Sequence, residues 1–88
     1  MAMGGYDEGT STPRQSVYEF ALLMEKVLLR HDHKGHWKDL SNEEIFALML
    51  EEVAELARAI YCNQKIALEA TDVANFCMML ADNNKGKR

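Results

Sequence analysis

The sequence predicts an all-α fold in which three helices form one small domain. Three stretches carry apolar residues at the spacing of one helix face, whereas strand-like alternation of useful length does not occur. Helix-start signals precede the first two stretches, and short polar segments separate all three. We expect residues 1–11 to be disordered, residues 12–82 to form the helical domain and residues 83–88 to form a flexible tail.

The first predicted helix begins near Thr12 and runs to about Arg30. Thr12 suits the N-cap, Pro13 the first helical position, and Gln15 closes a capping box. A polar connection that contains the only tryptophan, Trp37, follows this helix. The side chains expected on its buried face are Val17, Phe20, Ala21, Met24, Val27 and Leu28.

The second predicted helix has a complete start signal. Ser41 is the N-cap residue, and Glu44 closes a capping box with it. The apolar spacing continues to about Tyr61 or Cys62, so we expect a helix over this whole range.

A short turn connects the second helix to the third. Asn63 and Gln64 suit such a turn, with Asn63 in a left-handed conformation. The third helix is then expected from about Lys65 to Ala81 or Asp82. Helices joined by so short a turn lie antiparallel, so these two form a helical hairpin.

Size, charge and composition limit the partners of the chain. With 88 residues its core is marginal, so we expect a homodimer or homotetramer that completes the helical bundle. The net charge is −4 and no basic stripe is present, which argues against a nucleic-acid partner. No apolar run approaches the roughly 20 residues of a membrane span. Cys62 and Cys77 lack a metal-ligand spacing and are expected to be small core residues in a reducing cytoplasm.

Carboxylates interrupt the apolar faces of the second and third helices. At about 100° per residue, Glu52 falls inside the apolar stripe of its helix, with Glu51 and Glu55 on the flank. Glu69 falls inside the stripe of the third helix, and Asp72 lies beside it. A buried unpaired carboxylate is costly, and few basic residues are placed to pair with these groups. A bound metal ion is therefore the leading candidate for their partner.

The hairpin is expected to bring the two carboxylate clusters to the same height, because they lie at similar distances from the turn. Neither cluster contains His or Cys, and all-oxygen sites favour hard ions, chiefly Mg²⁺, Mn²⁺ or Ca²⁺. The Glu-x-x-His pairs of a di-iron bundle and the loop of an EF-hand are absent from the sequence. Mg²⁺ normally binds through a few carboxylates together with substrate phosphates. The predicted site is therefore typical of proteins that act on phosphate-containing substrates.

These residues match the motif of a known family. The pattern Glu51-Glu52-x-x-Glu55, followed by Glu69-x-x-Asp72, resembles the signature of the MazG-like all-α nucleoside triphosphate pyrophosphohydrolase superfamily. The segments Asp72-Val73-Ala74-Asn75-Phe76 and Asp32-His33-Lys34-Gly35-His36-Trp37 resemble its small phage and bacterial members. The resemblance covers roughly Val17 to Asp82.

The resemblance implies hydrolysis of a nucleoside triphosphate, such as a dNTP or a non-standard NTP, to the monophosphate and pyrophosphate. The role would be house-cleaning or control of the nucleotide pool. Glu52, Glu55, Glu69 and Asp72 would bind Mg²⁺, or alternatively Mn²⁺. Glu51 and Glu52 are the candidate catalytic residues, with Glu51 orienting or deprotonating the attacking water or only supporting the ligands. The chain is shorter than typical relatives, so a neighbouring subunit would complete the site.

Three further residues are candidates for substrate contacts. Asn75 lies one helical turn beyond Asp72 and would contact the sugar or base, unless it only caps a bundle interface. Trp37 would stack on a nucleobase or act as a partly buried packing anchor. Lys34 is the candidate phosphate contact by the resemblance of its loop. The histidines between residues 31 and 36 are expected to be solvent-exposed rather than metal ligands.

Two other functions stay open at this point. A non-catalytic helical association module would use its acidic groups to contact a basic partner. A nucleotide-binding module would hold a nucleotide without turnover. Release of pyrophosphate from triphosphates in the presence of Mg²⁺ distinguishes the enzyme from both alternatives.

Overall fold

The computed structural model describes residues 12–32 and 35–87, and it confirms the all-α prediction. The elements are α1 (Gln15–His31), the short 3₁₀ helix η3 (Trp37–Asp39), α2 (Asn42–Cys62) and α3 (Ile66–Asn83). No strand occurs within these two ranges. Lys34 and the segment 1–11 lie outside the described residues. None of the helices in the described part of the chain is long and apolar enough to cross a membrane.

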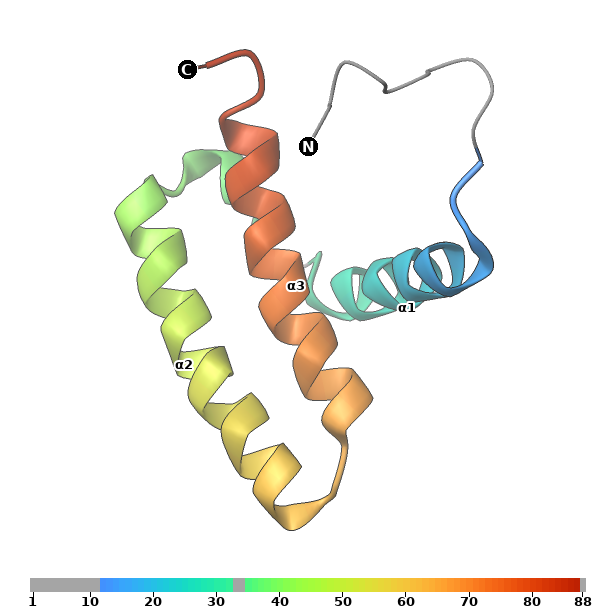
Figure 1. The fold of residues 1–88 in the computed structure, drawn as a ribbon. Helices are drawn as coiled ribbons and strands as arrows, with labels where there is room; N and C mark the ends of the chain where they lie inside the picture. The colour runs from blue at the N-terminus through green and yellow to red at the C-terminus, as the bar shows by residue number, and fades with distance from the viewer. Residues whose placement is uncertain (1–11, 33–34, 88) are drawn as a thin grey trace.

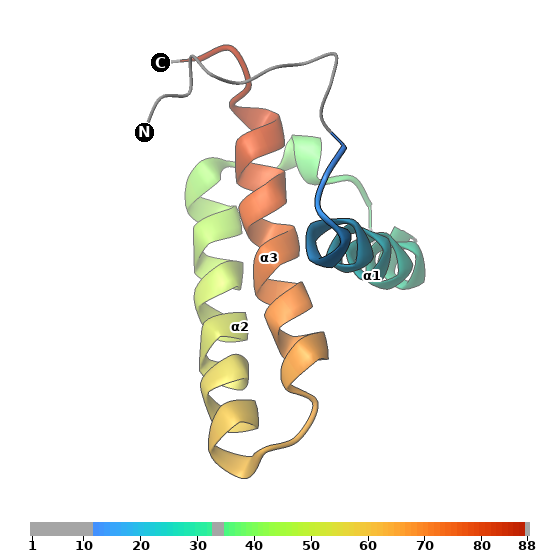
Figure 2. The ribbon, with the colours of Figure 1, turned by 45° about the vertical axis from the view of Figure 1, so that its right-hand side comes forward.

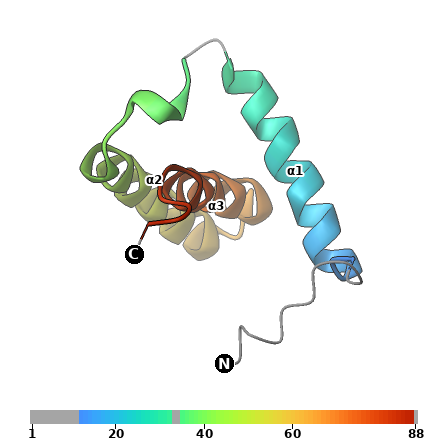
Figure 3. The ribbon, with the colours of Figure 1, turned by 90° about the horizontal axis from the view of Figure 1, so that it is seen from above.

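Helix α3 is the central element of the fold. It packs along α2 as an antiparallel hairpin, and α1 crosses its opposite side (Figures 1 and 3). The connection from α1 to α2 passes the C-terminal end of α3, where η3 packs against that helix (Figure 2). Residues of α1, α2 and η3 therefore meet around α3.

Local sequence signals determine the ends of the hairpin. The Ser41 hydroxyl accepts a hydrogen bond from the Glu44 N–H at 3.0 Å, and the Glu44 carboxylate accepts one from the Ser41 N–H at 2.8 Å. Asn63 ends α2 in the predicted left-handed conformation, with φ 56°. Lys65, just before α3, also has φ 56°, which the sequence did not indicate.

The start of α1 differs from the prediction. Arg14 is the N-cap residue and no side chain in the described part of the chain caps the helix, so the capping box predicted for Thr12 and Gln15 is wrong. The first helical hydrogen bonds end on the Arg14 carbonyl, which leaves Thr12 and Pro13 outside the helix. Gln15 instead donates a side-chain hydrogen bond to Glu19 at 2.9 Å.

The core of the single chain is small and draws residues from all three helices. Val27 of α1, Ile45 and Ala59 of α2, and Thr71 and Asn75 of α3 are buried. Only the C-terminal half of the predicted buried face of α1 is covered. The N-terminal half of that face is open to solvent, with residues Val17 and Phe20 at 52% and 37% exposure. Cys62 and Cys77 are free and exposed, so their predicted burial is wrong.

Candidate metal centre

Three carboxylates converge where α2 and α3 face each other. Glu52 of α2 and Glu69 and Asp72 of α3 each place one carboxylate oxygen within 4.8 Å of the other two. All three side chains are partly buried. The antiparallel hairpin thus brings together the two clusters that are far apart in sequence, as the spacing predicts. A set of three carboxylate oxygens fits a hard divalent cation, with room for water or phosphate oxygens as further ligands.

The electrostatics of this triad favour a cation. Burial raises the pKa of Glu52 above 4.5, and the negative charges of Asp72 and Glu69 raise it further. Burial also raises the pKa of Asp72 above 3.8, an effect that the nearby His31 opposes. Both shifts show that the ionised carboxylates lie in an unfavourable environment. A bound cation would remove this cost by neutralising them.

Glu51 and Glu55 lie beside the triad but do not belong to it. Both are exposed, and neither shares the 4.8 Å cluster of Glu52, Glu69 and Asp72. Their negative charges still contribute to the raised pKa of Glu52, that of Glu55 more than that of Glu51. The structure therefore places the two residues on the rim of the acidic site.

His31 is a site residue that the sequence reasoning missed. It is the last residue of α1, and it lies at the same cavity as Asp72 and close enough to lower the pKa of that carboxylate. The predicted helix ended at about Arg30, which placed His31 in a solvent-exposed loop. In the structure His31 belongs to the helix, and its side chain is exposed, as the sequence predicts.

A cavity of about 560 Å³ adjoins the triad. Glu52 and Asp72 form its acidic part, and Trp37 and Asn75 line it as well, so four of the predicted site residues share one cavity. It is mainly apolar elsewhere. The remaining lining residues are Val27, Leu28, His31, Gly35, His36, Asp39, Leu40, Leu48, Phe76 and Met79.

Asn75 carries an unpaired acceptor at this cavity. Only 4% of the residue is exposed, and its side-chain N–H donates to the Met24 carbonyl of α1 at 3.3 Å. That bond fixes the orientation of the amide, because a flipped amide would place Asn75 Oδ1 against the Met24 carbonyl oxygen, and both atoms are acceptors. The amide oxygen Oδ1 is buried and has no hydrogen-bond partner among the residues that the structure describes. Buried polar atoms are nearly always paired. Among the described residues Asn83 Oδ1 is a second such unpaired atom, but Asn83 does not line this cavity.

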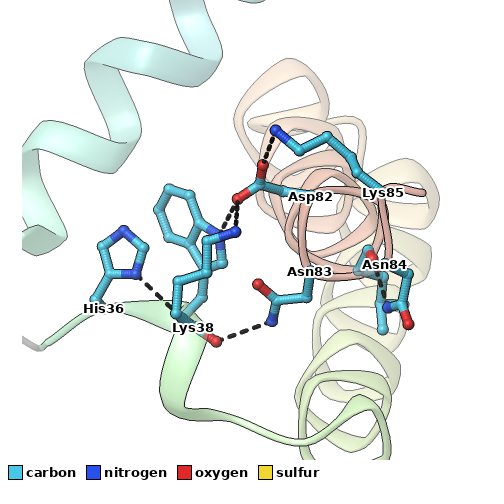
Figure 4. Close-up of polar contacts among 8 residues, drawn as sticks. His36, Lys38, Asp82, Asn83, Asn84 and Lys85 are labelled. Carbon is cyan, nitrogen blue, oxygen red and sulfur yellow. Dashed lines mark hydrogen bonds and ion pairs between the residues drawn. The ribbon is translucent and has the colours of Figure 1, made fainter. Parts of the chain in front are cut away.

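Trp37 is fixed by the last turn of α3. Its indole N–H donates to Asp82 Oδ2 at 3.0 Å, and its carbonyl accepts from the Asn83 side chain at 3.0 Å (Figure 4). The His36 ring stacks on the indole, with ring centroids 4.4 Å apart and an interplanar angle of 23°. Trp37 therefore acts as a partly buried anchor and also lines the cavity.

The phosphate contact predicted at Lys34 falls outside the described residues. Lys38, farther along the same connection, forms an ion pair with Asp82 at 2.9 Å. Sequence reasoning also missed Asp82. A partly buried tryptophan usually donates its N–H to an acceptor. Trp37 therefore indicated that an acceptor side chain lies nearby, although the sequence does not identify it as Asp82.

No protein-family model, curated protein or solved structure matches the chain. The resemblance to MazG-like enzymes rests on the motif residues alone.

Proposed function

We propose that the chain is a Mg²⁺-dependent nucleoside triphosphate pyrophosphohydrolase that acts in the cytoplasmic nucleotide pool, on dNTPs or non-standard NTPs. Water would cleave the bond between the α- and β-phosphates and give the nucleoside monophosphate and pyrophosphate. The observation that carries the proposal is the convergence of Glu52, Glu69 and Asp72 beside a cavity with an aromatic wall.

The acidic residues divide into ligands and rim residues. Glu52, Glu69 and Asp72 would hold Mg²⁺, or Mn²⁺, and Glu55 would join them as an exposed fourth carboxylate. When bound, such an ion polarises phosphoryl oxygens and neutralises the charge that develops during cleavage. Glu51 is exposed on the rim, where it would orient the attacking water or accept its proton.

The cavity suits the nucleoside part of such a substrate. Its volume of about 560 Å³ lies within the roughly 300–1,000 Å³ typical of small-molecule sites. His36 stacks on one face of the Trp37 indole, and the other face would stack on a nucleobase. Asn75 lines the cavity and would contact the sugar or base.

A homodimer or homotetramer is part of the proposal. Val17 and Phe20 continue the face of α1 that buries Val27, but within one chain they remain 52% and 37% exposed. Covering this face with a second copy would remove apolar surface from water and enlarge the small core.

The direct test is an assay of a triphosphate panel with Mg²⁺ that measures pyrophosphate and orthophosphate separately. The proposal expects pyrophosphate and monophosphate as the only products. Nucleotide binding without product would instead favour a nucleotide-binding module, and neither binding nor turnover would favour a helical association module with a basic partner.

A further inference from the structure

We propose that Asp82 is a positioning residue, which orients the Trp37 indole at the cavity and thereby determines how tightly the site holds the base of a nucleotide. This inference rests on the proposed function, because it assigns Trp37 to the base. It adds a residue that lies outside the carboxylate motif and outside the cavity lining.

The last turn of α3 contacts Trp37 at two points. Asp82 accepts the indole N–H at 3.0 Å, and Asn83 donates to the Trp37 carbonyl at 3.0 Å. These bonds connect residues that are distant in sequence, and they attach the connection between α1 and α2 to the central helix (Figure 4). The indole bond fixes the ring itself, whereas the Asn83 bond fixes only the backbone.

Asp82 is well suited to hold the ring because it stays ionised. Oδ2 accepts from both Trp37 and Lys38, and Oδ1 accepts from Lys85 at 2.9 Å. The hydrogen bonds from Lys38, Lys85 and Trp37 hold the pKa of Asp82 far below its usual value of 3.8. A hydrogen bond to an ionised acceptor is shorter and stronger than one between neutral groups.

Loss of the Asp82 carboxylate would weaken binding of the base of a nucleotide but not binding of its phosphates. Asp82 belongs neither to the acidic triad nor to the lining of the cavity, and of its partners Trp37, Lys38 and Lys85 only Trp37 lines the cavity. Loss of the carboxylate would leave the indole N–H without this acceptor, and the stacked His36 ring would then be a remaining contact that orients the indole. Stacking on the ring would weaken, whereas the metal and phosphate site at Glu52, Glu69 and Asp72 would be unaffected.

The test compares two probes by calorimetry on the full chain with Mg²⁺. One probe is a deoxynucleoside triphosphate whose α–β bridging oxygen is replaced by NH, and the other is pyrophosphate, which lacks a base. We expect Asp82→Ala to weaken nucleotide binding about tenfold, the size of a lost stacking contact, and to leave pyrophosphate binding unchanged. Asp82→Asn, which keeps an acceptor, should restore most of the affinity. Lys85→Ala, which removes an ion pair but leaves the acceptor of the indole, should bind both probes like the wild type.

A second variant separates positioning from folding. Trp37→Phe keeps an aromatic ring but removes the N–H, so adding Asp82→Ala to it should cause no further loss of nucleotide affinity. An additional loss in that background, equal losses for both probes, or no loss in Asp82→Ala would overturn the inference while leaving the proposed function in place. A wild-type chain that binds neither probe would overturn both.

Discussion

Glu52 and Asp72 meet across the α2–α3 hairpin, with carboxylate oxygens within 4.8 Å of each other and of Glu69. Burial raises the pKa of both residues, and Asp72 is the largest single charge acting on Glu52. The fold therefore holds like charges together in a partly buried site. This arrangement lowers the stability of the folded chain unless a bound cation neutralises the charges.

The first prediction concerns pH in the absence of metal. A carboxyl group whose pKa is raised by folding binds protons more tightly in the folded state, so stability increases as pH falls through that raised value. With EDTA present, the melting temperature should rise as the pH is lowered from 7 toward the ordinary value of 4.5 for Glu52. Asp82 has a lowered pKa, so its contribution is lost only below 3.8, outside this window.

Glu52→Gln is the matched variant for this pH experiment. It removes the charge but keeps the size, so the metal-free protein should melt at a higher temperature at pH 7 and depend less on pH. Differential scanning calorimetry between pH 7 and pH 5 measures both effects. A wild type that loses stability on acidification in this range, with Glu52→Gln behaving alike, would contradict the electrostatic account of the triad.

The second prediction concerns metal binding. On the proposed function Mg²⁺ would bind the folded site and not the unfolded chain, so it should raise the melting temperature, with a gain of about 2.7 kcal/mol in unfolding free energy at a hundredfold excess over Kd. Asp72→Asn should weaken this response because it removes a ligand charge, whereas Cys62→Ser on the exposed end of α2 should not change it. Melting curves that are identical in millimolar Mg²⁺ and in EDTA would exclude the site.

The third prediction concerns the turn between α2 and α3. Lys65 has φ 56°, a conformation that costs a residue with a Cβ about 1–2 kcal/mol. Lys65→Gly should therefore stabilise the protein by about 0.5–1 kcal/mol in urea unfolding. The control is Gln64→Gly. Gln64 lies between the left-handed residues Asn63 and Lys65 but has no positive φ, so glycine at this position should lower the stability of the protein. Equal effects of the two substitutions would count against this turn geometry.

The fourth prediction concerns association through α1. Val17 and Tyr18 are neighbours with nearly equal exposures of 52% and 51%, but only Val17 continues the face that buries Val27. Val17→Glu should therefore dissociate the oligomer to the 10.0 kDa chain, whereas Tyr18→Glu should not. Light scattering after size exclusion measures the mass. A wild type that is already monomeric at all concentrations would remove the oligomer from the proposal.

Some structural features that depend only on residues within one helical turn were predicted correctly. The capping box of Ser41 and Glu44 and the left-handed Asn63 depend on neighbouring backbone groups, and the structure confirms both. The juxtaposition of Glu52 with Glu69 and Asp72 followed from the hairpin, because a short turn leaves only one antiparallel register.

Features that depend on tertiary contacts were predicted less well. Periodicity identifies the apolar face of α1 but not which part another helix covers, so Val17 was expected to be buried and is exposed. The acceptor of the Trp37 N–H comes from Asp82 at the far end of the chain, and the environment of His31 depends on where α1 crosses α3. Spacing along one segment contains no information about such contacts.

The central claim is that the carboxylate triad drives Mg²⁺-dependent release of pyrophosphate from a nucleoside triphosphate. The most direct measurement compares that rate in the wild type, in Glu69→Gln and in Glu25→Gln, a matched substitution at an exposed residue of α1 outside the triad. The account predicts pyrophosphate release by the wild type, a loss of at least about a hundredfold in Glu69→Gln, and an unchanged rate in Glu25→Gln. A wild type that releases no pyrophosphate from any triphosphate, or a Glu69→Gln variant that matches the wild-type rate, would contradict it.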